Sequence, residues 1–145
     1  MEAKLNRFLD AQNQTYLKAL SEIKNGRKES HWMWYIFPQI KGLGHSEMAN
    51  YYGINGIEEA TAYLNHPVLR KHLLEITNAL LNINDKEAIE IFGSPDDLKL
   101  CSCMTLFAKT ENTDNVFGAV IEKYFNGIFD NLTLTLIDRF AAKAD

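Results

Sequence analysis

The sequence is poor in cysteine, and its two cysteines form no recognisable motif. Cys101 and Cys103 lie two positions apart in an apolar stretch with helical spacing. On a helix, residues at this spacing point to nearly opposite sides, which suits neither a disulfide nor a shared metal ion. We therefore predict two small buried thiols in a protein of a reducing compartment.

Long apolar runs and an excess of basic residues are also missing. No run approaches the roughly 18 apolar residues that span a bilayer. The start, MEAKLNRFLDAQ, lacks the basic and then apolar blocks of a signal peptide. The formal net charge is -4 and the pI about 5.6, whereas a nucleic-acid-binding protein normally presents a basic face. We expect a cytoplasmic protein that binds neither membranes nor nucleic acids.

No alternating strand pattern is longer than residues 132–136, and that segment also fits a helix. Apolar residues instead recur at helical spacing, beginning with residues 5–23, which end at Asn25-Gly26. Residues 98–107 are apolar on every side, as is typical of a central helix. We predict an all-α fold, a compact single-domain bundle over residues 1–145 (core roughly 5–140) of about seven or eight helices around a buried central helix.

Local signals place several helix ends. Ser46 can cap a short helix that runs to residue 52. Asp85 is expected to start another short helix, which stops at Gly93. Ser94 is expected to cap the buried helix, with Pro95 in its first position.

Both tryptophans of the chain, Trp32 and Trp34, lie in the unusual segment SHWMWYIFPQIKGLGHS, residues 30–46. Two positions along a helix turn by about 200°, so one ring can enter the core while the other borders a cleft. Indole offers a flat face for stacking and one N–H group. His31 and Gln39 flank the rings with groups that can transfer a proton or hold an amide-like edge. The alternative is a tryptophan-anchored core helix, with His31 bonded to the backbone.

The loop of residues 41–46 favours an anion. Gly42 and Gly44 allow a ligand to approach the backbone closely, and the helix start at Ser46 presents unpaired N–H groups. Residues 27–45 carry three basic residues against Glu29, a balance of +2 that leaves -6 for the rest of the chain. We expect a phosphate or carboxylate to bind here, with Lys41 as its partner. The alternative is a tight turn before a capped helix, since the spacing of a phosphate-binding P-loop is missing.

Asp96, Asp97 and Lys99 are a third group of candidates. Paired carboxylates can divide the roles of acid and base when their environments separate their pKa values. The alternative is structural, because acidic residues stabilise the first turn of a helix and Lys99 can pair with Asp96 three positions away. Metal ligands at a recognised spacing and a G-x-S-x-G motif are both missing, so neither a metal nor a cofactor is predicted.

Three motifs taken together, HWMWYIFPQ, GLGHS and PDDLKL, resemble the uncharacterised family known as domain of unknown function 1810, over roughly residues 5–129. The resemblance implies a compact helical domain in the cytoplasm and brings no established activity with it. It also implies a site at the positions that match the family, which are Gln12, His31, Trp32, Trp34, Pro38, Gln39, Gly44, Ser46, Tyr51, Asp96, Asp97 and Lys99.

Three functions remain open. The first is a hydrolase or N-glycosidase that acts on a small anionic nucleotide or ADP-ribose-type ligand, with His31, Asp96 or Asp97 as its acid or base. The second is a non-catalytic metabolite-binding module, and the third is a protein-interaction domain with an exposed tryptophan patch. The sequence does not indicate an oligomeric state. The ligand-binding residues would be Gln12, Trp32, Trp34, Gln39, Lys41, Gly44, Ser46, Tyr51 and Lys99.

Overall fold

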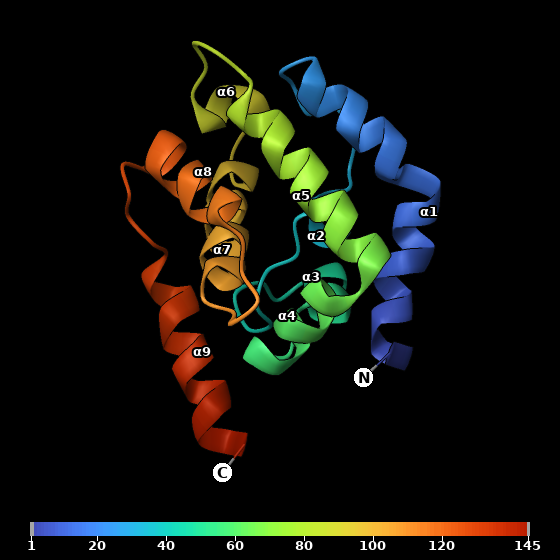
Figure 1. Cartoon of the computed structure of the whole chain (residues 1–145), viewed down its shortest axis with the longest axis vertical. Coiled ribbons are helices and arrows are strands. Elements are labelled where there is room, and N and C mark those ends of the chain that lie inside the picture. Colours follow the sequence, from blue (N-terminus) through green and yellow to red (C-terminus); the bar gives the residue numbers. More distant parts are fainter. Residues whose placement is uncertain (1, 145) are drawn as a thin grey trace.

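The computed structural model describes the backbone of residues 2–144, which forms nine α-helices joined by loops (Figure 1). The all-α class is confirmed, with one or two helices more than predicted. Within the described residues, the only β pairing is a single parallel bridge between Ile40 and Ile54. The helices are α1 (Glu2–Lys24), α2 (Met33–Ile36), α3 (Glu47–Tyr52), α4 (Gly56–Asn65), α5 (Pro67–Leu81), α6 (Ala88–Phe92), α7 (Asp96–Ala108), α8 (Asn115–Phe125) and α9 (Asn131–Ala144).

Helix α7 is the buried central helix that its apolar residues predict. It contacts α4, α6, α8 and α9 (Figure 1). Each fully buried large apolar side chain contributes roughly 1.5–3 kcal/mol relative to an exposed one, so this helix carries much of the core energy. Its apolar side chains without exposed surface are Leu100, Cys103, Met104, Leu106 and Phe107.

Helices α1 and α5 lie side by side, with α1 at the edge of the molecule and α5 between α1 and α8 (Figure 1). The start of α5 is set by a local signal, since Pro67 takes the first turn and His66 Nδ1 accepts a hydrogen bond from the backbone N–H of Val68 at 3.2 Å. Both helices bury large apolar residues in the core, including Phe8 and Ile23 of α1. A groove remains between the two helices at the surface.

Two predicted helix starts were wrong. Asp85 does not begin a helix, because its φ of 61° is left-handed, and α6 begins only at Ala88. Ser94 does not cap α7. Pro95 occupies the cap position after a cis peptide bond, and the helix begins at Asp96.

The two cysteines are free thiols on opposite sides of α7. Cys103 is fully buried and Cys101 is partly buried. Burial raises the pKa of both thiols, well above the usual value for Cys103. None of the described helices is long and apolar enough to cross a membrane.

Candidate functional site

A buried carboxylate fixes the start of the tryptophan segment. Glu22 of α1 accepts hydrogen bonds from the backbone N–H groups of Glu29 (2.8 Å) and Ser30 (3.0 Å), from the Ser30 hydroxyl (2.6 Å) and from Trp32 Nε1 (2.9 Å). Burial alone would raise the pKa of this carboxyl, but these hydrogen bonds lower it to about 2. The loop that leaves α1 is therefore bound back onto that helix.

The two tryptophans have different surroundings. Trp32 has no exposed surface, and its ring centroid lies 6.2 Å from that of Phe37 in the core. A ligand cannot stack on it, so Trp32 is a core residue and its predicted ligand-binding role was wrong. Trp34, two positions on, is half-buried and borders a small surface crevice. We call it the Trp34 crevice, and its lining is Met33, Trp34, Phe37, Gln39, Ala49, Tyr52, Gly53 and Lys99.

The Trp34 crevice brings together three of the predicted residues, and it is nearly filled. Its free space is about 10 Å³, room for about one water molecule. Lys99 Nζ lies 5.7 Å from the Trp34 ring centroid, within range of a cation–π interaction, and the Gln39 side chain lines the same crevice. Gly44 lies beside them: a Cβ there would be 2.6 Å from the Cβ of Ala49, so only glycine lets the loop lie so close to α3.

The two aspartates at the start of α7 have different partners. Asp96 forms ion pairs with Lys28 Nζ at 3.0 Å and with Lys99 Nζ at 3.6 Å. Each of its carboxylate oxygens is therefore paired with a lysine, and of the two lysines only Lys99 lines the crevice. Asp97 has one buried carboxylate oxygen, Oδ1, without a hydrogen-bond partner in the structure. A buried polar atom left without a partner calls for a functional or structural explanation.

Lys41 and Tyr51 line a second, larger hollow, which we call the Lys41 hollow. Its volume is about 560 Å³, and its lining is Lys4, Asn6, Arg7, Asp10, Lys41, Asn50, Tyr51, Gly53 and Asn55. Gly53 also lines the Trp34 crevice, so the two hollows are neighbours. Two backbone hydrogen bonds, each 2.9 Å long, join residues 39–41 to Ile54 between the two hollows. Lys41 N donates to Ile54 O, and Ile54 N donates to Gln39 O.

Seven predicted catalytic or ligand-binding residues line neither hollow: besides Trp32, Gly44, Asp96 and Asp97, described above, these are His31, Ser46 and Gln12. His31 is exposed, and its side chain makes no hydrogen bond with any residue that the structure describes. Ser46 is exposed, and its hydroxyl caps α3 by accepting from Ala49 N at 3.1 Å. Gln12 is 2 % exposed and lines a different hollow, the groove between α1 and α5. Neither Gln12 nor Ser46 therefore belongs to the Trp34 crevice.

The groove between α1 and α5 contains titratable groups that the sequence patterns did not indicate. His72 of α5 stacks on Tyr16 of α1, with centroids 3.7 Å apart and planes 12° from parallel. The Tyr16 hydroxyl donates to Glu75 Oε1 at 2.5 Å. Burial and then this carboxylate raise the pKa of Tyr16 well above its usual range, and burial lowers the pKa of His72. The one available signal was Gln12, a polar residue within the apolar stripe of α1.

Comparison with known proteins identifies the family and adds no activity. A family model described as a protein of unknown function (DUF1810) matches residues 2–137. The chain belongs to this family. The solved crystal structure of the conserved hypothetical protein Rv1873 from Mycobacterium tuberculosis is 46% identical and aligns with a TM-score of 0.90, covering 92% of this chain and 96% of that chain. No significant match is found among the curated proteins.

Proposed function

We propose that this protein binds a small anionic molecule of nucleotide or ADP-ribose type where the Trp34 crevice meets the Lys41 hollow, and that it hydrolyses the N-glycosidic bond of that molecule. One observation carries the proposal. An aromatic face, an ammonium group and an amide line a crevice that shares Gly53 with a hollow bearing three basic side chains. The lining of the Trp34 crevice suits a flat base, and the basic side chains of the Lys41 hollow suit a phosphate.

Lys99 must move before a base can stack on Trp34, because the crevice holds only about 10 Å³ of free space. Its contacts allow that movement. The Lys99 side chain is 28% exposed, and its distance to Asp96 is 3.6 Å. Ion pairs at the surface contribute about 0–1 kcal/mol, and this partly exposed pair is held at a long distance. Lys99 can therefore leave Asp96 for a ligand phosphate at small cost and uncover the indole face.

Lys41 lies against Gly53, the residue that the two hollows share, and is the cation that we assign to a second phosphate. Arg7 is occupied by Glu59, with Arg7 Nη2 lying 2.9 Å from Glu59 Oε1. Lys41 is exposed and forms no ion pair within the part of the chain that the structure describes. With Arg7 neutralised, Lys4 and Lys41 against Asp10 leave a charge of +1 in the hollow. That balance supports binding of an anion.

Asp97 lies two positions before Lys99 at the start of α7 and lines neither hollow. We assign it the hydrolytic step because its buried, unpaired Oδ1 can accept a hydrogen bond from water once Lys99 has moved. With a pyridinium N-glycoside, the water oxygen bonds to the anomeric carbon while the carbon–nitrogen bond breaks. The base leaves as a neutral molecule with the bonding electrons, and the proton of the water passes to the Asp97 carboxylate. Such a leaving base needs no proton, so the exposed His31 is not required.

Binding is tested by thermal unfolding of the full chain with ADP-ribose, AMP and NAD. At about 100 times the Kd, a ligand adds about 2.7 kcal/mol to the free energy of unfolding. We expect Trp34→Ala and Lys41→Ala to abolish the shift, while Trp34→Phe and the exposed, distant Lys18→Ala keep it. The binding proposal fails if none of the three compounds raises Tm in the wild-type protein.

Turnover is tested separately by chromatography of nicotinamide released from NAD. We expect Asp97→Asn to lose release while it keeps the thermal shift. A wild-type protein that binds but releases no nicotinamide would leave a non-catalytic metabolite-binding module. A protein-interaction domain with an exposed tryptophan patch is not supported, because Trp32 has no exposed surface and cannot contribute to such a patch.

A further inference from the structure

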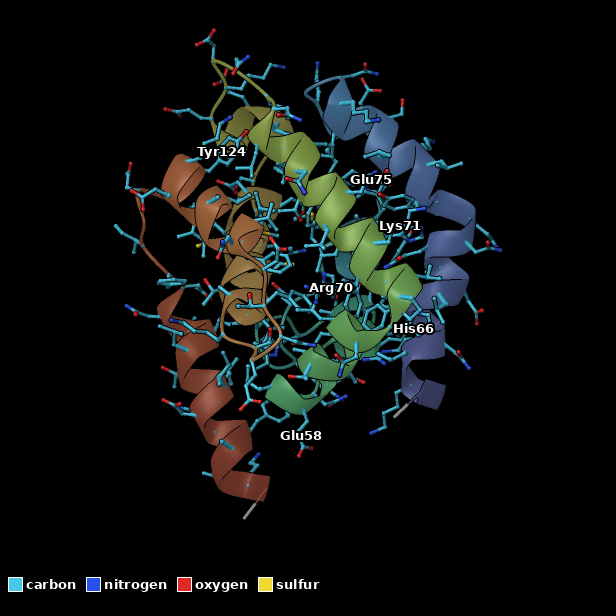
Figure 2. The ribbon with its side chains drawn as sticks, in the orientation of Figure 1. Glu58, His66, Arg70, Lys71, Glu75 and Tyr124 are labelled. Atoms are coloured by element: carbon cyan, nitrogen blue, oxygen red, sulfur yellow. The ribbon has the colours of Figure 1, made fainter. Side chains whose placement is uncertain are left out.

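The groove between α1 and α5 has the size and the mixed lining of a small-molecule site. Its volume is about 450 Å³, within the range of roughly 300–1,000 Å³ that such sites occupy. Lys71 and Glu75 project from α5 on the side that faces α1 (Figure 2). Leu17, which is 79% exposed, and Leu20 give the groove an apolar part. It shares no lining residue with the Trp34 crevice or the Lys41 hollow.

Gln12 determines which nitrogen of His72 carries the proton. One end of its side chain lies 2.8 Å from the Tyr35 carbonyl oxygen and 2.9 Å from the Tyr63 hydroxyl. A carbonyl only accepts, so that end must be the NH₂ group. The amide oxygen therefore faces His72 Nδ1 at 2.8 Å, and Nδ1 must donate. The neutral ring then has its lone pair on Nε2, which bonds to no residue that the structure describes.

The groups around the ring hold it in place and keep it neutral. Tyr16 of α1 stacks on one face, and its hydroxyl is bound to Glu75. Burial lowers the pKa of the imidazole, Glu75 opposes this effect and Lys71 adds to it, with a net lowering. Tyr63 lies behind Gln12 and keeps its proton, because burial raises its pKa above the usual range. His72 therefore presents a free base in the groove at neutral pH.

We propose that this groove is a general-base site for the hydrolysis of a small ester with an apolar part, and that Nε2 of His72 is the base. Nε2 takes a proton from water as the water oxygen bonds to the carbonyl carbon. The ester carbon–oxygen bond then breaks, and the imidazolium returns the proton to the departing alkoxide. Lys71 lies in the groove to stabilise the negative carbonyl oxygen, and Leu17 and Leu20 contact the apolar part.

The test is the hydrolysis of 4-nitrophenyl acetate by the full chain. We expect saturable hydrolysis that His72→Gln lowers at least tenfold, since a general base contributes about 10²–10⁴-fold. His45→Gln, which removes an exposed imidazole outside the groove, should leave the rate unchanged. The rate should rise with pH around an inflection below the usual histidine pKa of about 6.5. An equal rate in His72→Gln, or an inflection at or above that value, would overturn the proposal.

The tautomer gives a second test that does not depend on turnover. Long-range ¹H–¹⁵N spectra should show neutral His72 with its proton on Nδ1, and a proton on Nε2 would contradict the assignment of the base. Circular dichroism of His72→Gln checks that the variant is folded. The same variant should keep its thermal shift with ADP-ribose, because the two sites share no lining residue.

Discussion

The indole N–H of Trp32 donates a 2.9 Å hydrogen bond to the carboxylate of Glu22, ten positions earlier in the chain. This contact decides which tryptophan enters the core. Because Glu22 also binds the backbone of residues 29 and 30, the approach of the chain to α2 is fixed before Trp34 is reached. Trp34 is left at the surface crevice.

Glu22→Gln should destabilise the protein in a pH-dependent way. The folded pKa of Glu22 is about 2, against an ordinary value of 4.5, so the ionised form is favoured by folding. This difference contributes up to about 3 kcal/mol above pH 4.5 and is lost as the pH falls toward 2. The amide keeps the shape of the side chain but removes its charge. Urea unfolding should show the full difference in the free energy of unfolding between wild type and variant at neutral pH. At about pH 3 it should show less than half of that difference.

Glu29→Gln is the matched control, because Glu29 is exposed and contacts Glu22 through its backbone N–H. We expect its effect to stay within about 0.5 kcal/mol at both pH values. A Glu22→Gln gap of the same size at about pH 3 and at neutral pH would contradict the role given to the charge.

Glu59→Gln should be strongly destabilising. Glu59 is completely buried, and its carboxylate is paired with Arg7 through bonds of 2.9 and 3.2 Å. Burial alone would raise the pKa of Glu59, but Arg7 and then Asn55 N–H lower it. The variant leaves a largely buried guanidinium without its counter-ion, which costs about 3–5 kcal/mol. Chemical denaturation measures the loss, and the exposed neighbour Glu58→Gln (Figure 2) should change stability by less than about 0.5 kcal/mol.

Helix ends that depend on local chemistry could be predicted from the sequence. Ser46 caps α3, and Asn126 and Gly127 adopt positive φ at the end of α8, as their residue types indicate. Asp85 was misjudged because it adopts a left-handed backbone instead of capping a helix. The central helix could be predicted because apolar residues recur on every side of it, although Leu98 in its first turn is 63% exposed.

The candidate sites could be predicted only in part, because they depend on contacts between distant segments. Trp34, Gln39 and Lys99 line one crevice because the tryptophan segment and the start of α7 lie against each other. The choice of Trp34 over Trp32 depends on Glu22, which lies outside the motif. The groove pairs Tyr16 with Glu75, 59 positions apart, and Gln12 with His72, 60 positions apart. Residue spacing within a short segment cannot indicate pairs that lie so far apart in the sequence.

Gly53→Ala should destabilise the junction of the Trp34 crevice and the Lys41 hollow. The backbone of Gly53 (φ -61°, ψ 133°) suits any residue, so the constraint is space. A Cβ would lie 2.7 Å from Lys41 Cβ and 2.8 Å from Lys41 Cα. The Ile40–Ile54 bridge must then open, at a cost of about 1–3 kcal/mol. Gly118→Ala is the control, because nothing lies within 4 Å of a Cβ added there on α8. The free energy of unfolding of this variant should rise by about 0.5–1 kcal/mol, and its Tm should rise accordingly. A Gly53→Ala protein as stable as wild type would contradict this account.

Tryptophan fluorescence should separate the two rings and test the proposed site directly. Trp34 is half-buried at the crevice, whereas Trp32 is fully buried beside Glu22. We expect iodide and ADP-ribose to quench the emission of Trp32→Phe, which retains Trp34. The emission of Trp34→Phe comes from Trp32 alone and should resist both quenchers, because neither can contact a ring without exposed surface. Equal quenching of the two variants by ADP-ribose would place the nucleotide away from Trp34 and would contradict the stacking on which the proposed function depends.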